Sequence, residues 1–467
     1  MENFRYADIH CHPTLKAFGH SFDKRKNARA DMWFHQPPSF ITKKLHQFTG
    51  ATKFSQSNFT SLAKARAKIV LLSLYPFEKG FFLGSPVHPL LLAIIGGWGL
   101  EIGFRRIRHL QKHKNYFNDL LSEYEFVLNS NRQQVIDGAT HSWQLTTNWQ
   151  DVELISGQEN SIAVIITIEG AHVFNSGLAE FGVATDETCM LANITKVKSW
   201  KYPPLFITLA HNFNNDLCGH ARSLQRLGNL VNQNKNLETG LTPLGIKVIN
   251  ALLDNSNGRS ILIDLKHMSI ASRQQYMQLL QTNFRERQIP LLVSHAAVTG
   301  LSFNGQKISD GCFDIFNEGS INFYDEEIIA IAKSGGLFAL QMDIGINTDL
   351  KKLKNNMPRI ANEIPHRTSA RIIWNQLQHI AVLLDAEGMF CWDTAAVGSD
   401  FDGGIKPLPG IFTAEGFEPV AKELEILAHD FLARKTFKLA ENMQISAEEI
   451  VDLFFYGNMV TFLKKNF

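Results

Sequence analysis

Eight short apolar runs recur along the 467-residue chain, and each has the length of a buried strand. Most are rich in Val, Ile and Leu and lack the polar alternation of a half-exposed strand, as is typical of parallel strands covered on both faces. The runs occupy residues 7–9, 69–74, 162–168, 205–209, 261–265, 291–293, 337–341 and 395–397.

Helix signals lie between several of these runs. Thr242 and Pro243 form a cap and a first-turn proline, residues 272–287 and 325–333 have amphipathic patterns, and Ser446 and Glu449 form a capping box. Alternating strands and helices predict βαβ units, which either close into a barrel or form an open doubly wound sheet. No glycine-rich nucleotide motif follows any strand, which favours an α/β fold of the (β/α)8 TIM barrel type.

The chain length is compatible with one decorated barrel over residues 1–467. Two stretches, at about 13–68 and 76–161, are longer than a crossover needs, and we expect them to be insertions after the first and second strands. The second contains the strongest apolar run, residues 89–100, which is too short to span a bilayer. A buried segment or an apolar lip near a pocket is the favoured interpretation of this run, and contact with a membrane surface is the alternative.

Charge and cysteine usage exclude several classes of protein. The formal net charge of +1 argues against a general nucleic-acid-binding surface, and the basic run at 105–114 is interpreted as a solvated helix face. The five cysteines are too scattered for a disulfide framework or a structural zinc site. With no signal peptide and no transmembrane segment in the sequence, we expect a cytoplasmic protein.

Metal-competent side chains follow the apolar runs where each run ends. They are His10 and His12, Glu169, His211, His267, His295 and Asp400. In a barrel the carboxyl ends of all strands face one mouth, so residues hundreds of positions apart converge there. His10 and His12 are two apart on a strand and point to the same side, whereas Cys11 between them points into the barrel wall.

Imidazole and carboxylate ligands favour zinc, with other transition metals as alternatives. A carboxylate has two oxygens, so Glu169 can bridge two divalent ions. Asp400 stands at a strand end and is the candidate general base or acid, since it can take a proton from a metal-bridged water and pass it to a leaving amine. We therefore expect a binuclear metal-dependent hydrolase that acts through a metal-bridged hydroxide.

The motifs around these residues, in this order, resemble the membrane dipeptidases (renal dipeptidase-like, peptidase family M19) of the amidohydrolase superfamily. The matching pieces are Asp8-Ile9-His10-Cys11-His12, Ile168-Glu169-Gly170-Ala171-His172, Thr208-Leu209-Ala210-His211-Asn212, Asp264-Leu265-Lys266-His267-Met268-Ser269, Val293-Ser294-His295-Ala296 and Gly398-Ser399-Asp400-Phe401-Asp402-Gly403. The resemblance implies that His10 and residue 12 bind the first zinc ion, that Glu169 bridges, and that His267 and His295 bind the second. It further implies that His211 contacts the substrate carbonyl, that Asp400 carries the proton, and that the chain forms a homodimer.

Two positions depart from the family pattern. The family usually has His-x-Asp at the first strand, where this chain has His10-x-His12. The family also holds the carboxylate of a dipeptide with an arginine, and Ile321 stands in its place. Such a clamp needs a cation, so Arg222 and Lys307 are candidate replacements.

Three functions are compatible with these residues. The first is a dipeptidase whose partner is a small dipeptide substrate. The second is another amidohydrolase acting on a cyclic amide, a lactone, an N-acyl amino acid or a phosphoester, which the missing arginine favours. The third is a non-catalytic barrel, against which the complete set of candidate ligands argues.

Overall fold

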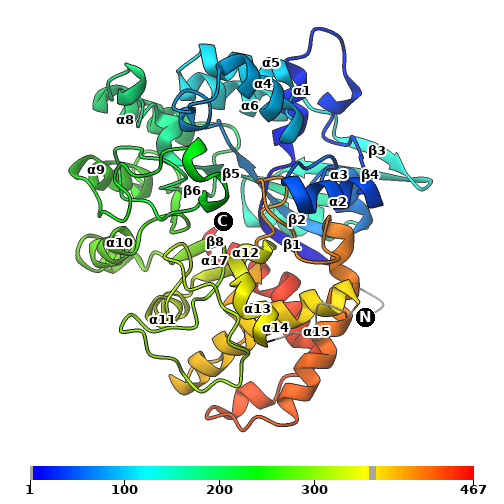
Figure 1. Cartoon of the computed structure of the whole chain (residues 1–467). Helices are drawn as coiled ribbons and strands as arrows, with labels where there is room; N and C mark the ends of the chain where they lie inside the picture. Colours follow the sequence, from blue (N-terminus) through cyan, green and yellow to red (C-terminus); the bar gives the residue numbers. More distant parts are fainter. Residues whose placement is uncertain (1–3, 357–363) are drawn as a thin grey trace.

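The computed structural model describes residues 4–356 and 364–467, and its centre is a parallel β-barrel surrounded by helices (Figure 1). Neighbouring strands follow the order β1-β2-β5-β6-β7-β8-β9-β10. The two ends of this sheet meet, because the His12 N–H donates to Phe401 O at 2.9 Å and the Asp400 N–H donates to His10 O at 2.9 Å. The predicted (β/α)8 fold is confirmed.

All eight apolar runs form strands of the barrel. The strands are β1 (Tyr6–Cys11), β2 (Ala67–Leu74), β5 (Ser161–Glu169), β6 (Phe206–Thr208), β7 (Leu262–Asp264), β8 (Leu292–Ala296), β9 (Leu337–Leu340) and β10 (Ala395–Val397). A hairpin that the sequence did not predict, β3 (Gln133–Ile136) and β4 (Ala139–Leu145), extends the sheet because β4 pairs in parallel with β5 outside the barrel.

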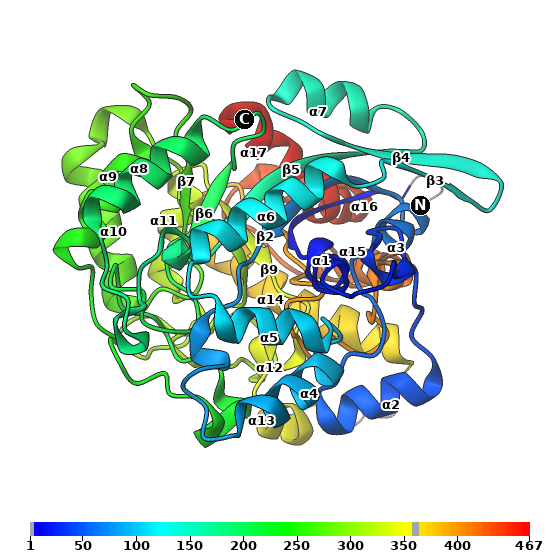
Figure 2. The same cartoon turned by 90° about the horizontal axis from the view of Figure 1, so that it is seen from above.

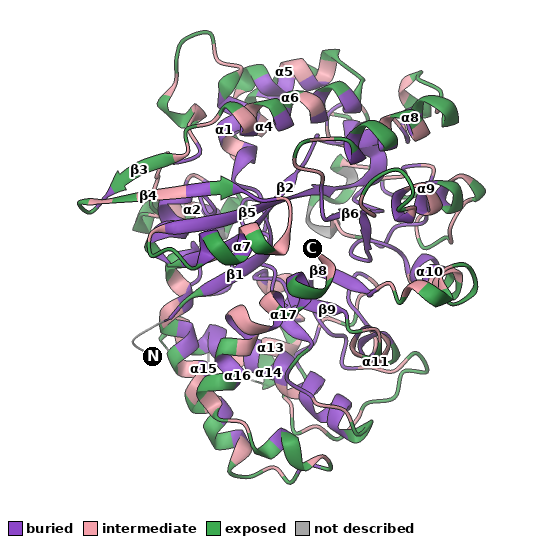
Figure 3. Cartoon of the chain, turned by 180° about the vertical axis from the view of Figure 1, so that it is seen from behind, coloured by how far each residue is buried: buried purple, intermediate pink, exposed green. Residues whose placement is uncertain are grey.

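The side chains of each strand alternate between the barrel interior and the surrounding helices. On β2, Ile69 and Leu71 belong to the interior cluster, whereas Val70 and Leu72 pack in the outer one. The C-terminal helix α17 (Asn458–Asn466) contributes Met459 to the interior cluster and so covers one end of the barrel. Figure 3 shows these buried strands from behind, with exposed helix faces around them.

The stretch between β1 and β2 carries short helices, and the longer stretch between β2 and β5 carries both helices and the hairpin. The first contains α1 (Thr14–Ser21), α2 (Phe40–Thr49) and α3 (Phe59–Lys64); the second contains α4 (Pro89–Gly99), α5 (Phe104–Lys112), α6 (Tyr116–Asn129) and α7 (Trp149–Ser156). Seen from above, α2 and α4 lie on one side of the molecule and α7 and α17 on the other (Figure 2).

The remaining helices follow the later strands. They are α8 (Glu187–Lys198), α9 (Pro243–Leu253), α10 (Ile270–Asn283), α11 (Asp325–Lys333), α12 (Ile344–Asn347), α13 (Leu350–Asn356), α14 (Pro365–Ala386), α15 (Phe417–Leu432) and α16 (Ala447–Asp452). The predicted cap at Thr242 and the capping box at Ser446 and Glu449 are confirmed. In the part of the chain that the structure describes, every helix is too short or too polar to cross a bilayer.

Candidate metal centre

The strand ends bring seven predicted residues to one mouth of the barrel. Glu169 is the last residue of β5, and His295 lies within β8. His10 lies within β1, and the other four follow their strands by one to three residues. All seven side chains are buried: His10, His12, Glu169, His211, His267, His295 and Asp400.

Local irregularities in two strands aim histidines into the barrel. Between β1 and β2, Asp8 pairs with Val70 and Cys11 pairs with Leu72. Two residues of β1 therefore lie opposite a single residue of β2, which is a β-bulge. Such a bulge re-aims side chains. Ile9 packs in the interior cluster and His10 also faces the centre, while Cys11 lies in the outer cluster as predicted.

A second bulge lies in β8. Val293 pairs with Phe338 of β9, and Ala296 pairs with Leu340, so two residues of β8 again lie opposite a single residue of β9. Val293 and Ala296 both pack in the outer cluster. The two residues between them, Ser294 and His295, are therefore free to turn toward the mouth.

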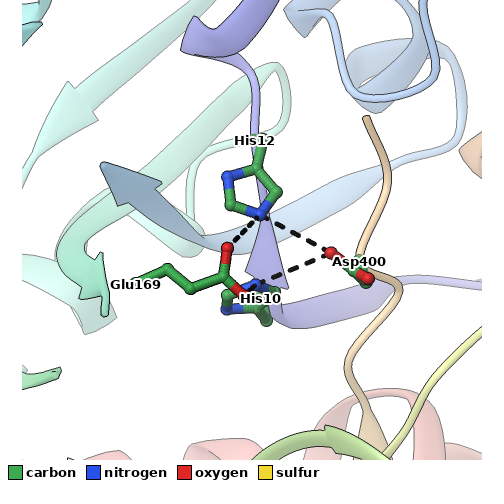
Figure 4. Close-up of side chains that lie close together, drawn as sticks. All are labelled: His10, His12, Glu169 and Asp400. Carbon is green, nitrogen blue, oxygen red and sulfur yellow. Dashed lines mark ion pairs between the residues drawn. The ribbon is translucent and has the colours of Figure 1, made fainter. Parts of the chain in front are cut away.

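The first group of side chains contains two histidines and two carboxylates (Figure 4). His10 Nε2 lies 3.4 Å from Glu169 Oε1 and 3.7 Å from Asp400 Oδ1. His12 Nε2 lies 3.2 Å from Glu169 Oε2 and 3.5 Å from Asp400 Oδ1. The predicted same-side placement of His10 and His12 is confirmed.

The second group shares Glu169 with the first. Glu169 Oε1 lies 3.7 Å from His267 Nε2 and 3.5 Å from His295 Nε2, and the two Nε2 atoms are 3.3 Å apart. In each group the donor atoms lie within 4.8 Å of one another. Oε1 of Glu169 thus lies near nitrogens of both groups, and its Oε2 lies near His12.

The nitrogens of this centre suit metal ions better than they suit hydrogen bonds. His12 Nδ1 lies 3.2 Å from Ser73 O, so that nitrogen is a donor and Nε2 is the ring atom that faces the carboxylates. His12 Nε2 and both ring nitrogens of His10 are buried without a hydrogen-bond partner. Buried polar atoms without partners are costly, and divalent ions among imidazole and carboxylate donors would satisfy them.

The electrostatics of the centre separate its histidines into two kinds. Burial lowers the pKa of His267 to about 3, with the charges of His211 and Lys266 adding to the effect. Burial, His10 and Lys266 lower the pKa of His295 well below its usual value. Both rings are therefore neutral and can offer lone pairs to a metal.

Glu169 has the opposite balance. Burial raises the pKa of the Glu169 carboxyl, but the surrounding histidines outweigh burial and hold that pKa well below its usual value. Glu169 in turn acts on His12. Burial lowers the pKa of His12, but the charge of Glu169 raises that pKa to about 10. An ionised carboxylate at the meeting point of the two groups is what a bridging ligand requires.

His211 lies beside the two groups and is held by a carboxylate that sequence reasoning missed. Its Nε2 is 3.4 Å from Glu169 Oε1, and its Nδ1 is 2.6 Å from Glu78 Oε2. The backbone N–H of Phe213 donates to Glu78 Oε1 at 2.9 Å. Glu78 follows β2 by four residues, so the strand-end rule that found the other residues could have found it.

Asp400 is held in a strained backbone conformation with φ of +57°, in the left-handed region that non-glycine residues rarely adopt. Its Oδ2 accepts a hydrogen bond from Gln341 Nε2 at 2.6 Å, and Lys266 Nζ donates to Gln341 Oε1 at 3.4 Å. Gln341 and Lys266 were not assigned a role from the sequence, although both stand at strand ends. With Oδ2 engaged, Oδ1 is the oxygen that faces His10 and His12.

Comparison with known proteins places the chain in a family. The sequence model of membrane dipeptidases (peptidase family M19) matches residues 130–431, well over half of the chain. The chain belongs to this family. A search of curated proteins finds no match.

Two solved metallopeptidase structures share the fold of this chain. Dipeptidase AC, a metallopeptidase of family M19, is 12% identical with a TM-score of 0.52, over 89% of this chain and 90% of that one. A metallopeptidase from Rhodobacter sphaeroides, crystallised with a phosphinate mimic of the dipeptide L-Ala-D-Ala, is 11% identical with a TM-score of 0.53 over 99% of both chains. With the family and the buried donor groups together, this M19 protein is a metal-dependent hydrolase resembling the metallodipeptidases.

In this M19 protein a buried isoleucine, Ile321, occupies the position where the family has its carboxylate-binding arginine. The guanidinium of Arg273 lies behind the same loop, where its Nη1 donates to Ser320 O at 2.9 Å and its Nε to Glu327 Oε1 at 2.6 Å. Arg273 is fully buried and paired, so it holds the loop rather than facing the mouth.

The structure places the two candidate replacements differently. Lys307 is exposed and pairs with Asp314 at 3.0 Å and with Glu318 at 3.4 Å. Arg222 is also exposed, donates to Asn234 Oδ1 at 3.2 Å, and directly follows Ala221, whose N–H donates to His267 O at 2.8 Å. Arg222 is therefore attached to the backbone of the centre, whereas Lys307 is neutralised by acidic residues near it.

Proposed function

We propose that the chain hydrolyses the amide bond of a dipeptide at a centre of two divalent metal ions, with zinc as the best fit. The observation that supports this most strongly is the sharing of Glu169 between two buried groups of donor atoms. His10 and His12 would hold the first ion, His267 and His295 the second, and Glu169 both. Bound divalent ions would supply Lewis acidity, which polarises a carbonyl and lowers the pKa of a water molecule.

The residues around the ions would divide the remaining work. Asp400 would take a proton from the attacking water at Oδ1 and pass it to the leaving amine, because Gln341 occupies its other oxygen. His211 donates from Nε2 to the oxygen of the substrate carbonyl, where negative charge develops, while Glu78 holds its Nδ1. Both groups are buried at the mouth, which excludes bulk water from these proton positions.

His12 changes the charge of the first group. Where the family has aspartate, this chain has an imidazole, which carries no negative charge, so one negative charge fewer faces the ion. Asp400 lies 3.5 Å from His12 and brings a carboxylate to the same group. We infer that the first ion is the more weakly held of the two and the first to leave on chelation.

Arg222 is the proposed partner of the substrate carboxylate. It lies next to Ala221, which is hydrogen-bonded to the backbone of His267, so its backbone is close to one of the candidate metal ligands. A guanidinium also matches a carboxylate in two-point geometry, which an ammonium such as Lys307 does not.

The deciding experiment is hydrolysis of a dipeptide library by zinc-loaded protein, followed by mass spectrometry. The library should contain L,L and L,D dipeptides, since the structurally similar Rhodobacter sphaeroides enzyme was crystallised with a mimic of L-Ala-D-Ala. Asp400→Asn is the control, because it keeps the shape of the side chain and removes the proton acceptor. Cleavage by the parent that is absent from this variant supports the proposal.

The second candidate function is hydrolysis of a substrate without a free carboxylate. The buried Ile321 in place of the family's arginine favours it. A panel of N-acyl amino acids, lactones, cyclic amides and phosphoesters tests it in the same assay. Turnover of this panel by protein that carries two metals and leaves every dipeptide intact would replace the first proposal by the second.

A further inference from the structure

Helix α4 exposes an apolar face to solvent, which contradicts the buried segment, one of the two interpretations favoured from its sequence. Four of its aliphatic side chains and Trp98 are between 47% and 54% exposed: Leu90, Leu91, Ile94, Ile95 and Trp98. The helix packs on α5 through its small residues, since a side chain at Gly97 would meet the Phe104 backbone at 2.9 Å. The helix contains no charged residue. Its large side chains thus face outward while its small ones make the contact.

Helix α2 adds to this face. Phe40 and Ile41 are each 76% exposed, and Phe48 is 84% exposed. The C-terminal ends of α2 and α4 are joined, because the Thr52 N–H donates to Gly99 O at 3.1 Å. Figure 2 shows both helices on the same side of the molecule. We name these eight exposed side chains of α2 and α4 the α2–α4 surface.

The segment that carries this surface is strongly basic. Residues 13–115 contain 17 Lys and Arg against 4 Asp and Glu, a formal charge of +13, so the rest of the chain carries −12 of the total of +1. Lys44 and Arg105 are exposed on α2 and α5, and the Lys53 ammonium lies 4.4 Å from the centre of the Trp98 ring. The near-neutral net charge of the whole chain therefore conceals a strongly basic segment.

One residue of the basic run differs from its predicted role. Arg106 is buried, where its guanidinium forms two hydrogen bonds with Asp119 at 2.5 and 2.7 Å and lies between the rings of Phe18 and Phe22. Arg106 therefore links α5 to α6 through Asp119. The solvated charges beside the α2–α4 surface are therefore those of its neighbours, such as Arg105.

We propose that the α2–α4 surface docks on an anionic lipid bilayer. Large exposed apolar patches mark interaction sites, and aliphatic and aromatic side chains bordered by lysine and arginine are suited to the boundary between headgroups and acyl chains. The phosphate and carboxylate groups of anionic lipids complement the charge of residues 13–115.

The charge also distinguishes a bilayer from other occupants. In a symmetric dimer the same patch meets itself, so the basic residues of both copies would face one another. A nucleic acid would satisfy the charges but offers little to five aliphatic side chains. The bilayer matches both features at once.

The docking surface is close to the metal centre but distinct from it. Ala93 of α4 packs in one apolar cluster with Tyr75, whose ring lies 4.8 Å from that of His211. The α2–α4 surface also lies outside residues 130–431, which carry the family match. The proposal therefore stands independently of the substrate.

Flotation with lipid vesicles tests the proposal on the full chain. We expect binding to vesicles of phosphatidylcholine with phosphatidylglycerol, and at least tenfold weaker binding to phosphatidylcholine alone. Leu91→Glu together with Ile95→Glu should abolish binding. The matched control is Leu154→Glu on α7, which is 68% exposed on the opposite side and should bind like the parent.

Charge variants give a second, milder test. Lys44→Gln and Arg105→Gln should each weaken binding about fivefold, the equivalent of about 1 kcal/mol per basic residue near an anionic surface. Binding should also fall as salt rises. Brominated lipids should quench the fluorescence of the parent more than that of Trp98→Phe.

Three results would overturn the proposal. One is equal binding to neutral and anionic vesicles, and another is unchanged binding of the double glutamate variant. The third is light scattering that shows a stable dimer which the double glutamate variant breaks, because a second copy of the chain would then be the occupant.

Discussion

Replacing Glu78 by glutamine tests whether His211 acts as a proton donor. Glu78 is buried, and its Oε2 lies 2.6 Å from His211 Nδ1. Glutamine has nearly the same shape but no charge, and its amide offers one acceptor oxygen where the carboxylate offers two. Glu78→Asp is the matched control, since it keeps the charge.

The direction of the effect follows from the pKa of His211. Burial lowers that pKa, whereas the carboxylates of Glu169 and Glu78 raise it to about 10. A charge-assisted hydrogen bond contributes about 1 to 1.5 kcal/mol more than a neutral one, which corresponds to about one pKa unit. Removing the charge of Glu78 therefore makes His211 lose its proton about one pH unit lower.

The assay is the pH dependence of kcat/KM with the best substrate of the library. We expect the alkaline limb of the Glu78→Gln profile to move down by about one pH unit, to near pH 9, with kcat near neutral pH little changed because His211 stays protonated there. The metal content should stay the same, since Glu78 belongs to neither donor group. An alkaline limb that coincides with that of the parent would refute the role of His211 as donor.

Three further changes give separable results. Glu169→Ala should release both metals and abolish turnover, as followed by elemental analysis, because one carboxylate serves both donor groups. His267→Ala should reduce the metal content by about one ion, and retention of two would count against its assignment. His379, buried between Asp310 and Asp325, has a pKa that burial lowers and these two carboxylates raise to about 9. Its stabilisation is fully present below pH 6.5 and is lost as pH rises through 9, so His379→Gln should cost about 3 kcal/mol at pH 6, and the free energy of unfolding of the parent should approach that of the variant above pH 9.

The barrel and most of its centre could be predicted because both follow from local patterns. A strand buried on both faces has to be apolar throughout, and the carboxyl ends of parallel strands share one mouth. Glu169 at the end of β5 and His267 after β7 needed no other information. Glu78 escaped because its loop was interpreted as part of an insertion, although that loop starts at a strand end like the others.

The direction in which the side chains of His10 and His295 point could not be predicted without the three-dimensional structure. Simple alternation places Ile9 and His10 on opposite sides of β1, yet both face the interior, because the bulge inserts one residue between Asp8 and Cys11. The same holds for Ser294 and His295 in β8. Bulges arise from the pairing of two strands, so the sequence of one strand does not contain them.

Helix α4 shows why an apolar pattern alone does not distinguish an interior from a surface. A buried helix and a lipid-facing helix bury the same kind of side chain, and both remove apolar area from water. The face of α4 that carries small residues distinguishes the two cases here. Ala93 and Gly97 let α5 approach closely, which leaves Leu91 and Ile95 facing away from the protein. The surrounding charge supplies the missing criterion, because a core excludes lysine and arginine whereas an anionic interface attracts them. An apolar run inside a segment with a charge of +13 is therefore better explained by an interface than by a core.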